Sequence, residues 1–297
     1  MNLGDPSTHV PCSPGQIDPA GPSAPARAPT TVQLPSPGTT PYWEAKTVRL
    51  FLGDSLSLLS GFPPETFDLI FADPPYFLSS GGTTCHAGRM VSVDKGAWDK
   101  PPPPEQIHEF NVEWLRLCKR VLKPDGTIWV SGTLHNIYSV GYAMQTLGLR
   151  ILNDIAWFKV NPPPNLGCRC FAHATETILW ASKGKRAKHT FNYEEMKRAN
   201  GNRQMQSLWH IPPPGPGEKR YGKHPTQKPE ALLSRIIAAS SLPGGFVLDP
   251  FCGSGTTGVA CVRLGRVFVG IELERDYIDV AKQRISDEVA QCVLSFD

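Results

Sequence analysis

Four consecutive residues, Asp73-Pro74-Pro75-Tyr76, combine a carboxylate, two rigid carbonyl groups and an aromatic ring. Prolines have a fixed φ and no N–H, so the direction of their carbonyls is set in advance. A carboxylate and a carbonyl can accept the N–H groups of an aromatic amine and turn its delocalised lone pair toward an electrophile, and Tyr76 gives a flat face for stacking a ring. The alternative is a stiff turn without chemistry, because Asp and Pro are common in turns.

A second group is the glycine-rich turn Gly253–Gly255, which follows the apolar run 246–248. With Gly258 it fits G-x-G-x-x-G, a pattern whose glycines let the backbone approach a ligand and start a helix at once. Glu272 follows at the spacing of a carboxylate that binds both ribose hydroxyls, about 20 residues on. This pattern does not choose between NAD and S-adenosylmethionine (AdoMet), and a turn without any ligand would also satisfy it. Asp249 favours AdoMet, whose ammonium needs an acceptor and which has no pyrophosphate.

Alternating strands and helices place both groups at strand ends. The chain is predicted to be an α/β protein with a mostly parallel sheet and helices on both faces, in which ligands bind beyond the carboxyl ends of the strands. The predicted strands are 47–52, 67–72, 127–130, 155–158, 177–181, 246–248 and 266–271. The predicted helices are 55–59 with Ser55 as its cap, 105–122, 136–147, 229–240, 256–264 and 276–289. Pro124-Asp125-Gly126 predicts a turn between elements.

Composition divides the chain into two parts. Residues 1–41 are rich in Pro, Ser, Thr, Ala and Gly and predict a disordered tail, which leaves one domain over 42–297. The net charge of +3 permits a nucleic-acid partner without requiring one. The eight cysteines lack zinc-type spacing, so no metal is expected. No apolar run is long enough to span a membrane and no secretory signal is evident, which favours a cytoplasmic protein with reduced thiols.

Residues 182–223 lack clear periodicity and are rich in basic and aromatic side chains. Basic groups neutralise phosphates, and Arg, Asn and Gln read base edges, so this stretch is the predicted recognition region for nucleic acid. A solvated basic loop is the alternative. The side chains proposed to contact DNA are Lys183, Lys185, Arg186, Lys188, Arg198, Arg203 and Arg220, with Lys197 and Lys219 adding to the local charge.

Taken together, these motifs resemble the β-class amino-methyltransferases of bacterial restriction–modification systems. The resemblance runs from about residue 48 to 285, and its most specific elements are Asp73–Tyr76, Phe251-Cys-Gly-Ser-Gly255 and His224-Pro-Thr-Gln-Lys-Pro229, in that family's D-P-P-Y, F-x-G-x-G and H-P-T-Q-K-P patterns. It implies a circularly permuted sheet of seven strands, one of them antiparallel. The cofactor-binding residues that it implies, beside Asp249, are Asp54, Thr226, Lys228, Phe251, Cys252, Gly253, Ser254, Gly255 and Glu272.

The same resemblance implies particular roles. Asp54 would lie near the cofactor adenine, although it also suits a helix-flanking turn, and Thr226 and Lys228 would contact the methionine part of AdoMet. Trp98-Asp99 resembles a Trp-Asp pair in the loop after D-P-P-Y. Ser often replaces the Asp in the family's cytosine-N4 enzymes, so Asp73 favours adenine-N6.

The expected function is AdoMet-dependent methylation of a flipped-out adenine in double-stranded DNA. Cytosine-N4 methylation is the nearest alternative. An NAD-dependent oxidoreductase and a non-catalytic DNA-binding protein are alternatives of other classes, and the oxidoreductase leaves Asp73–Tyr76 unexplained. The resemblance leaves open a homodimer and a cognate restriction endonuclease, and the sequence decides neither.

Overall fold

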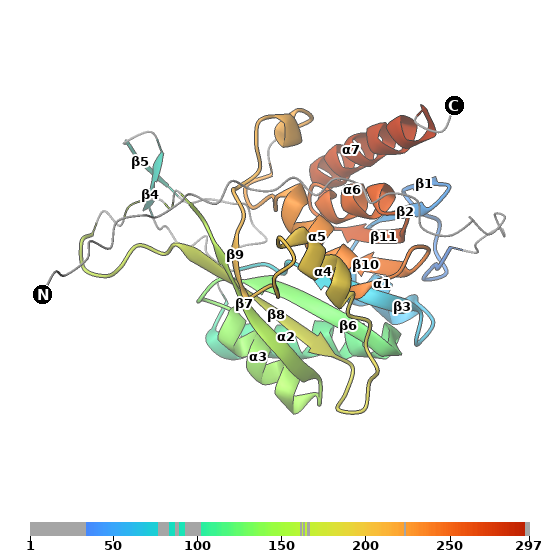
Figure 1. Ribbon diagram of the computed structural model, residues 1–297, viewed down its shortest axis with the longest axis horizontal. Coiled ribbons are helices and arrows are strands. Elements are labelled where there is room, and N and C mark those ends of the chain that lie inside the picture. Colours follow the sequence, from blue (N-terminus) through green and yellow to red (C-terminus); the bar gives the residue numbers. More distant parts are fainter. Residues whose placement is uncertain are drawn as a thin grey trace, which may run out of the picture.

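The computed structural model describes residues 34–76, 83–86, 89–92, 102–160, 162, 164, 167–222 and 224–294, in which nine strands form one mixed sheet (Figure 1). The order across the sheet is β1 (Trp43–Ala45), β2 (Val48–Leu52), β11 (Val267–Glu272), β10 (Phe246–Asp249), β3 (Phe67–Ala72), β6 (Leu122–Gly132), β8 (Thr175–Ser182), β7 (Arg150–Phe158) and β9 (Leu208–His210). A separate antiparallel pair consists of β4 (Thr83–His86) and β5 (Arg89–Ser92).

The central strands run parallel, and one of the long strands runs against them. β2, β11, β10, β3 and β6 pair in parallel, whereas β8 is antiparallel to both β6 and β7. The predicted α/β class with a mostly parallel sheet is therefore confirmed. Two short edge strands extend the expected seven, since β1 pairs antiparallel with β2 and β9 pairs parallel with β7.

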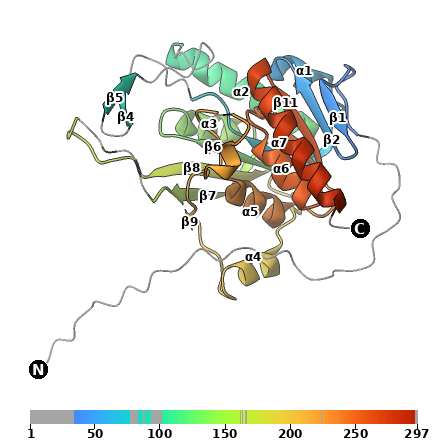
Figure 2. The same ribbon diagram turned by 90° about the horizontal axis from the view of Figure 1, so that it is seen from above.

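Helices cover both faces of the sheet, and each face has its own apolar core. The first face is covered by α1 (Ser55–Gly61), α2 (Pro104–Val121) and α3 (Ile137–Thr146). The second is covered by α5 (Glu230–Ser240), α6 (Thr256–Arg263) and α7 (Arg275–Leu294), with α4 (Tyr193–Ala199) packed on α5. Figure 2 shows α2 and α3 on one side of the strands and α4 and α5 on the other.

The strand β3 shows why the sequence gives this layering. Its side chains alternate between the faces, with Leu69 and Phe71 in the core under α5 and α6 and Ile70 and Ala72 in the core under α2. A strand buried on both faces has a continuous apolar run instead of an alternating one. Asp73 is the first polar residue after that run, so it comes at the carboxyl end of the strand, an edge that we call the carboxyl edge.

Some local predictions were wrong. The cap of α1 is Asp54 instead of Ser55, because the Asp54 side chain accepts the N–H of Ser57 at 2.7 Å. Pro124–Gly126 lies within β6, where the pairing with β3 passes from Leu122 opposite Phe67 to Thr127 opposite Leu69, so these residues form an irregularity inside a strand and not a turn between two elements.

The described chain begins within the predicted tail of residues 1–41. The Arg49 guanidinium donates to the carbonyl oxygens of Leu34 at 2.6 Å and Pro35 at 3.4 Å, so contacts with the domain begin before residue 42. Residues 1–33, the pair Trp98-Asp99 and Lys223 lie outside the described residues. Among the described residues no helix is long and apolar enough to cross a membrane.

Candidate active site

One cavity of about 410 Å³ opens at the carboxyl edge and brings the predicted site residues together. This volume lies within the range of small-molecule sites, roughly 300–1,000 Å³. Asp73, Pro74, Pro75 and Tyr76 line it, as does every predicted cofactor residue except Gly255. Parallel neighbours β3, β10 and β11 end side by side there, and this explains how segments far apart in sequence meet.

Asp73 is held by two hydrogen bonds on its two carboxylate oxygens. The Tyr76 hydroxyl donates to Oδ1, and the Lys228 ammonium donates to Oδ2 at 2.5 Å. The Tyr76 oxygen also lies 3.4 Å from the Ser131 hydroxyl. Tyr76 is only 5% exposed and lines the cavity, where its hydroxyl contacts Asp73; its predicted role in stacking the base stays a prediction.

Lys228 lies beside the predicted catalytic carboxylate. Its ammonium contacts Asp73, the Tyr76 hydroxyl at 2.9 Å and the Thr226 carbonyl at 3.3 Å, and Oε2 of Glu176 is 3.7 Å away. Lys228 also lines the cavity, and its predicted contact with the methionine part of the cofactor stays a prediction. Thr226 lines the cavity, with its N–H 3.3 Å from Nδ1 of His224.

Burial and charge act against each other at this pair. Burial raises the pKa of the Asp73 carboxyl, and the adjacent Lys228 ammonium opposes that shift. Burial also disfavours the charged form of Lys228, but Asp73 and Glu176 outweigh this effect, so the pKa of Lys228 is raised. Lys228 therefore carries a full positive charge at neutral pH, and a carboxylate beside it is its natural partner.

The glycine turn needs its glycines for backbone conformation and for space. Gly253 and Gly255 have φ values of +52° and +76°, in the left-handed region. A Cβ at Gly255 would lie 2.8 Å from that of Ala281, and one at Gly253 would lie 3.2 Å from the His224 ring. Gly253 thus faces the cavity, whereas Gly255 packs closely against α7.

Two further carboxylates point into the turn. Asp249 accepts the Thr257 hydroxyl at 2.5 Å and the Phe251 N–H at 3.0 Å, and Glu272 accepts the N–H of Gly253 at 2.7 Å. Burial raises the pKa of Asp249 to about 7 and also raises that of Glu272. Three buried acids in one cavity, counting Asp73, fit a ligand that brings positive charge, such as the ammonium and sulfonium of AdoMet.

Asp54 has a structural contact and also faces the cavity. It is exposed, caps α1 and belongs to the cavity wall. Phe251 and Cys252 follow Asp249 in the same wall, and the Phe251 ring packs edge-on against Trp114 of α2 with centroids 5.5 Å apart. These residues fit one end of an elongated cofactor, with Asp73 at the other side of the cavity.

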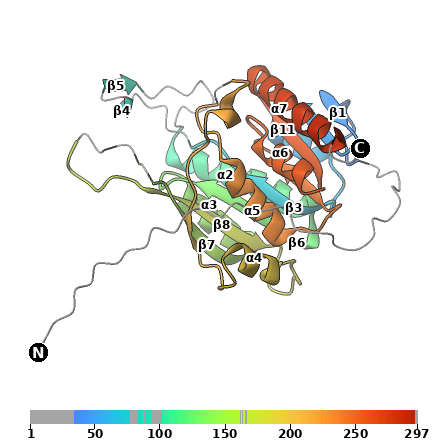
Figure 3. The ribbon, with the colours of Figure 1, turned by 45° about the horizontal axis from the view of Figure 1, so that its top comes forward.

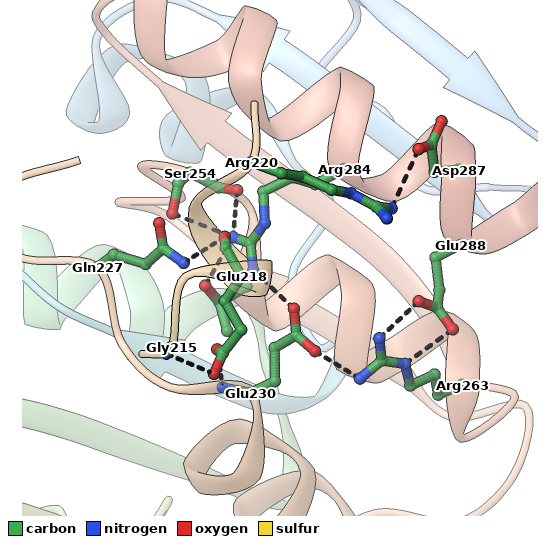
Figure 4. Close-up of polar contacts among 11 residues, drawn as sticks. Gly215, Glu218, Arg220, Gln227, Glu230, Ser254, Arg263, Arg284, Asp287 and Glu288 are labelled. Atoms are coloured by element: carbon green, nitrogen blue, oxygen red, sulfur yellow. Dashed lines mark hydrogen bonds and ion pairs between the residues drawn. The ribbon is translucent and has the colours of Figure 1, made fainter. Parts of the chain in front are cut away.

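An ion network, which we call the clasp, ties the glycine turn to α5 and α7 (Figure 4). Arg284 donates to the Ser254 carbonyl at 2.7 Å, the Thr256 hydroxyl at 2.9 Å and Glu230 at 2.9 Å. The clasp consists of Arg284, Glu230, Arg263 and Glu288. Arg284 is 4% exposed in its side chain, so the clasp fixes the turn from inside the protein.

The segment 211–222, which we call the strap, is fastened to the start of α5. The Glu218 carboxylate accepts the N–H of Glu230 at 2.8 Å and that of Gly215 at 3.3 Å, and its carbonyl accepts the Gln227 side chain at 2.8 Å. Figure 4 shows these contacts beside the clasp. The strap and the clasp together hold the segment that carries Thr226 and Lys228.

The predicted DNA contacts do not gather around the cavity. Because β8 runs antiparallel, its last residue, Ser182, pairs with Thr127 at the edge where the parallel strands begin. Lys183 donates there to the Leu122 carbonyl at 2.6 Å, and the backbone N–H of Lys188 donates to Asp125 at 2.7 Å. The exposed residues Lys185 and Arg186 lie in the same short segment.

Arg198 and Arg203 are also far from the catalytic side chains. They are exposed at and after the end of α4, whose Met196 packs on Ala238 and Ala239 near the end of α5. Since α5 begins near the cavity, its last turn lies toward the opposite edge. Of the predicted DNA contacts, Arg220 alone belongs to the strap, where it pairs with Asp287 of α7 at 3.1 Å.

Several residues of the site carry no signal in the sequence. Glu176 is one acid at the start of an apolar strand, and Arg284 is one of many charged residues on a long helix. His224 belongs to a motif, but its contact with the Gly253 turn comes from the fold. In the part of the chain that the structure describes, no group of His, Cys, Asp and Glu could hold a metal ion.

Comparison with known proteins agrees with this geometry. Residues 67–283 match the model of the N6_N4_Mtase family, described as DNA methylase. The chain is 54% identical over 251 residues to the Type II methyltransferase M2.DpnII of Streptococcus pneumoniae, covering 84% of this chain and 94% of that protein.

Solved structures share the fold. The M1.HpyAVI–SAM complex is similar with a TM-score of 0.60 and 28% identity, over 80% of this chain and 98% of that one. The cytosine-N4-specific PvuII DNA methyltransferase has a TM-score of 0.66 at 21% identity, over 86% and 95% of the two chains, a likeness of fold alone.

The fold and the cavity together define an AdoMet-dependent methyltransferase. They do not favour the alternative of an NAD-dependent oxidoreductase. The chain belongs to the N6_N4_Mtase family of DNA methylases. DNA is thus its substrate.

Proposed function

We propose that this protein transfers a methyl group from AdoMet to the exocyclic N6 amino group of an adenine in double-stranded DNA. One observation carries the proposal: Asp73, Asp249, Glu272 and the glycine turn line the same cavity. The cavity therefore offers acceptors for the N–H groups of a target amine beside acceptors for a cationic cofactor. AdoMet supplies the methyl group as an electrophilic carbon on a sulfonium.

The residues around the cavity act by holding and orienting. Asp73 and the Pro74 carbonyl accept the N–H groups of the amine and turn its lone pair toward the bound cofactor. Because the amine of a paired base lies within the stack, the base is rotated out of the duplex before it reaches this depth. Asp249 binds the ammonium and Glu272 the ribose of AdoMet, while Asp54 faces the adenine end. Developing charge is stabilised by these fixed groups, without a covalent intermediate.

The acids of the turn argue against NAD at the same place. A pyrophosphate uses the free N–H groups of a glycine turn and the start of its helix. Here the N–H of Gly253 is taken by the Glu272 carboxylate, and Asp249 adds a second negative group nearby. The choice of adenine over cytosine rests on Asp73, since Ser is frequent there in the cytosine-N4 enzymes that the chain resembles.

The order of the motifs supports the β class, because Asp73–Tyr76 precedes the recognition region and the glycine turn comes last. A relative named as a Type II methyltransferase supports a cognate restriction endonuclease as the functional counterpart. The homodimer that the resemblance leaves open is tested by measuring the mass of the protein in solution.

The deciding experiment incubates the protein with labelled AdoMet and unmethylated genomic DNA, then digests the DNA and identifies the methylated nucleoside by mass spectrometry. N6-methyladenine is the expected product. N4-methylcytosine would overturn the adenine assignment while keeping the reaction class, and the absence of any methylated nucleoside, with AdoMet binding intact, would overturn the proposed substrate.

A further inference from the structure

Glu176 is a buried acid that no motif accounts for, and it lies beside the catalytic pair. It stands near the start of β8 on the same face as Ile178 and Trp180, and its side chain is 10% exposed. The ammonium of Lys159, the residue after β7, binds its Oε1. Its Oε2 lies 3.7 Å from the Lys228 ammonium, beyond hydrogen-bond distance. Lys159 thus anchors one oxygen, and the other lies near the Lys228 ammonium.

The contact between Lys228 and Asp73 conflicts with the reaction. The ammonium donates to Oδ2 of Asp73 at 2.5 Å, and the Tyr76 hydroxyl already donates to Oδ1. An incoming amine must therefore share or replace the contact on Oδ2. The amine nitrogen also gains positive charge as it takes the methyl group, so an ammonium fixed beside it would oppose the reaction.

We propose that Glu176 is a positioning residue that draws the Lys228 ammonium away from Asp73 when the target amine enters, so that Oδ2 of Asp73 accepts the amine N–H. The proposal rests on the proposed function. Lysine suits this movement, since its ammonium is a point charge on a flexible chain with three donors. Lys228 moves between two carboxylates and stays paired throughout, which avoids the cost of an isolated buried charge.

The surroundings fit this exchange. The groups that face Lys228 are Asp73 and Tyr76 from the end of β3, Glu176 from β8 and the Thr226 carbonyl of its own loop. Lys159 faces Glu176 from β7, and Asp249 is the next acid along the cavity. In either position of Lys228 the two lysines and two acids of the cluster balance in charge.

The test compares Glu176→Gln with wild type in single-turnover methylation at saturating AdoMet and DNA, across pH. We expect the pH-independent rate to fall about 10- to 100-fold, the range of a lost hydrogen bond to a charged group. AdoMet affinity should stay within about twofold of wild type, since Glu176 does not contact the glycine turn. Glu109→Gln, which removes an exposed acid from α2, is the control for net charge.

The pH profile separates positioning from a simple charge effect. Glu176 raises the pKa of both Asp73 and Lys228, so its removal should move both limbs of the profile to lower pH. If the limbs move while the plateau rate is unchanged, Glu176 acts only through its charge and the proposal is wrong. A fall in rate matched by an equal fall in AdoMet affinity would also overturn it, because that result indicates general damage to the fold.

A double-mutant cycle completes the test. In a Lys228→Met background, Glu176→Gln should lower the rate less than about twofold further, because there is no ammonium left to move. Additive effects would contradict the proposal. The comparison holds whichever base is methylated, so N4-methylcytosine as product would refute the adenine assignment and leave the result for Glu176 standing.

Discussion

Two charge clusters lie on either side of one short segment, and they differ in the cation that each uses. Lys228 joins Asp73 and Glu176 at the cavity, and Glu230, two residues later, joins Arg284 and Arg263 in the clasp. The clasp binds protein to protein, since Arg284 holds the backbone of Ser254 and Arg263 donates to both oxygens of Glu288. The cavity cluster instead includes Asp73 and Lys228, which line the proposed active-site cavity.

The difference follows from the chemistry of the two cations. A guanidinium is planar, remains charged and binds in a fixed fork, so an arginine pair holds one geometry. An ammonium can change acceptor by a small rotation of its chain. The arginine cluster thus holds the site in place, whereas the lysine cluster can exchange partners within it. Substitutions in the two clusters test these two roles separately.

The largest effect is expected from the cavity cluster. Asp73→Ala should lower methyl transfer roughly 1,000-fold or more, because the amine loses the acceptor that orients it. AdoMet affinity should change less than about threefold, since Asp249, Glu272 and the glycine turn remain. Single-turnover assays and a fluorescence titration measure the two quantities. Substantial residual turnover by the variant would show that Asp73 does not orient the amine, and the lysine cluster would then have no role in catalysis.

The clasp should respond in the opposite way, by losing stability. Arg284→Met leaves Glu230 and the Ser254 carbonyl without their buried donor and should lower the free energy of unfolding by about 3–5 kcal/mol. Arg220→Met is the matched control, because its pair with Asp287 is about half exposed and should contribute about 0–1 kcal/mol. Urea denaturation measures both. Equal losses would mean that the clasp does no more than a surface ion pair.

The cofactor side of the cavity should respond to pH. Burial raises the pKa of Asp249 to about 7, so this acid becomes protonated as the pH falls below that value. A neutral carboxyl cannot balance the ammonium of AdoMet, so the Kd should rise about tenfold for each pH unit below about 7. Calorimetry between pH 5 and 8, chosen as roughly the range around that pKa, measures the slope. Asp249→Asn should bind weakly with little pH dependence, and a retained slope would assign the titration to another group.

Much of the cofactor side could be predicted from the sequence because its signals are local. Once a parallel sheet is inferred, a carboxylate after a buried strand, or glycines at a strand-to-helix turn, can be assigned to the carboxyl edge of that sheet. This is why Asp73, Asp249 and Glu272 meet in one cavity as expected. The partners of those residues could not be predicted, since Glu176 and Arg284 reach the site through strand order and helix packing, which leave no spacing pattern in the chain.

The basic region shows the limit of reading charge along the sequence. Lys183 to Lys188 follow β8 directly, but the direction of that strand decides the edge at which they emerge. Composition reports a basic stretch and says nothing of strand direction. The loop between β7 and β8, with Arg169 exposed in it, instead emerges at the carboxyl edge (Figures 1 and 3).

This placement gives the smallest effect that we predict. Reversing two charges in Lys185→Glu/Arg186→Glu should change the KM for DNA less than about twofold, because β8 spans eight residues and separates these side chains from the cavity edge by about 25 Å. That distance exceeds the screening length of roughly 8–10 Å at physiological salt. Arg169→Glu, at the carboxyl edge, should raise KM several-fold and flatten its salt dependence. A strong effect of the double variant would mean that DNA extends around the sheet to the opposite edge, and it would restore the region after β8 as a recognition surface.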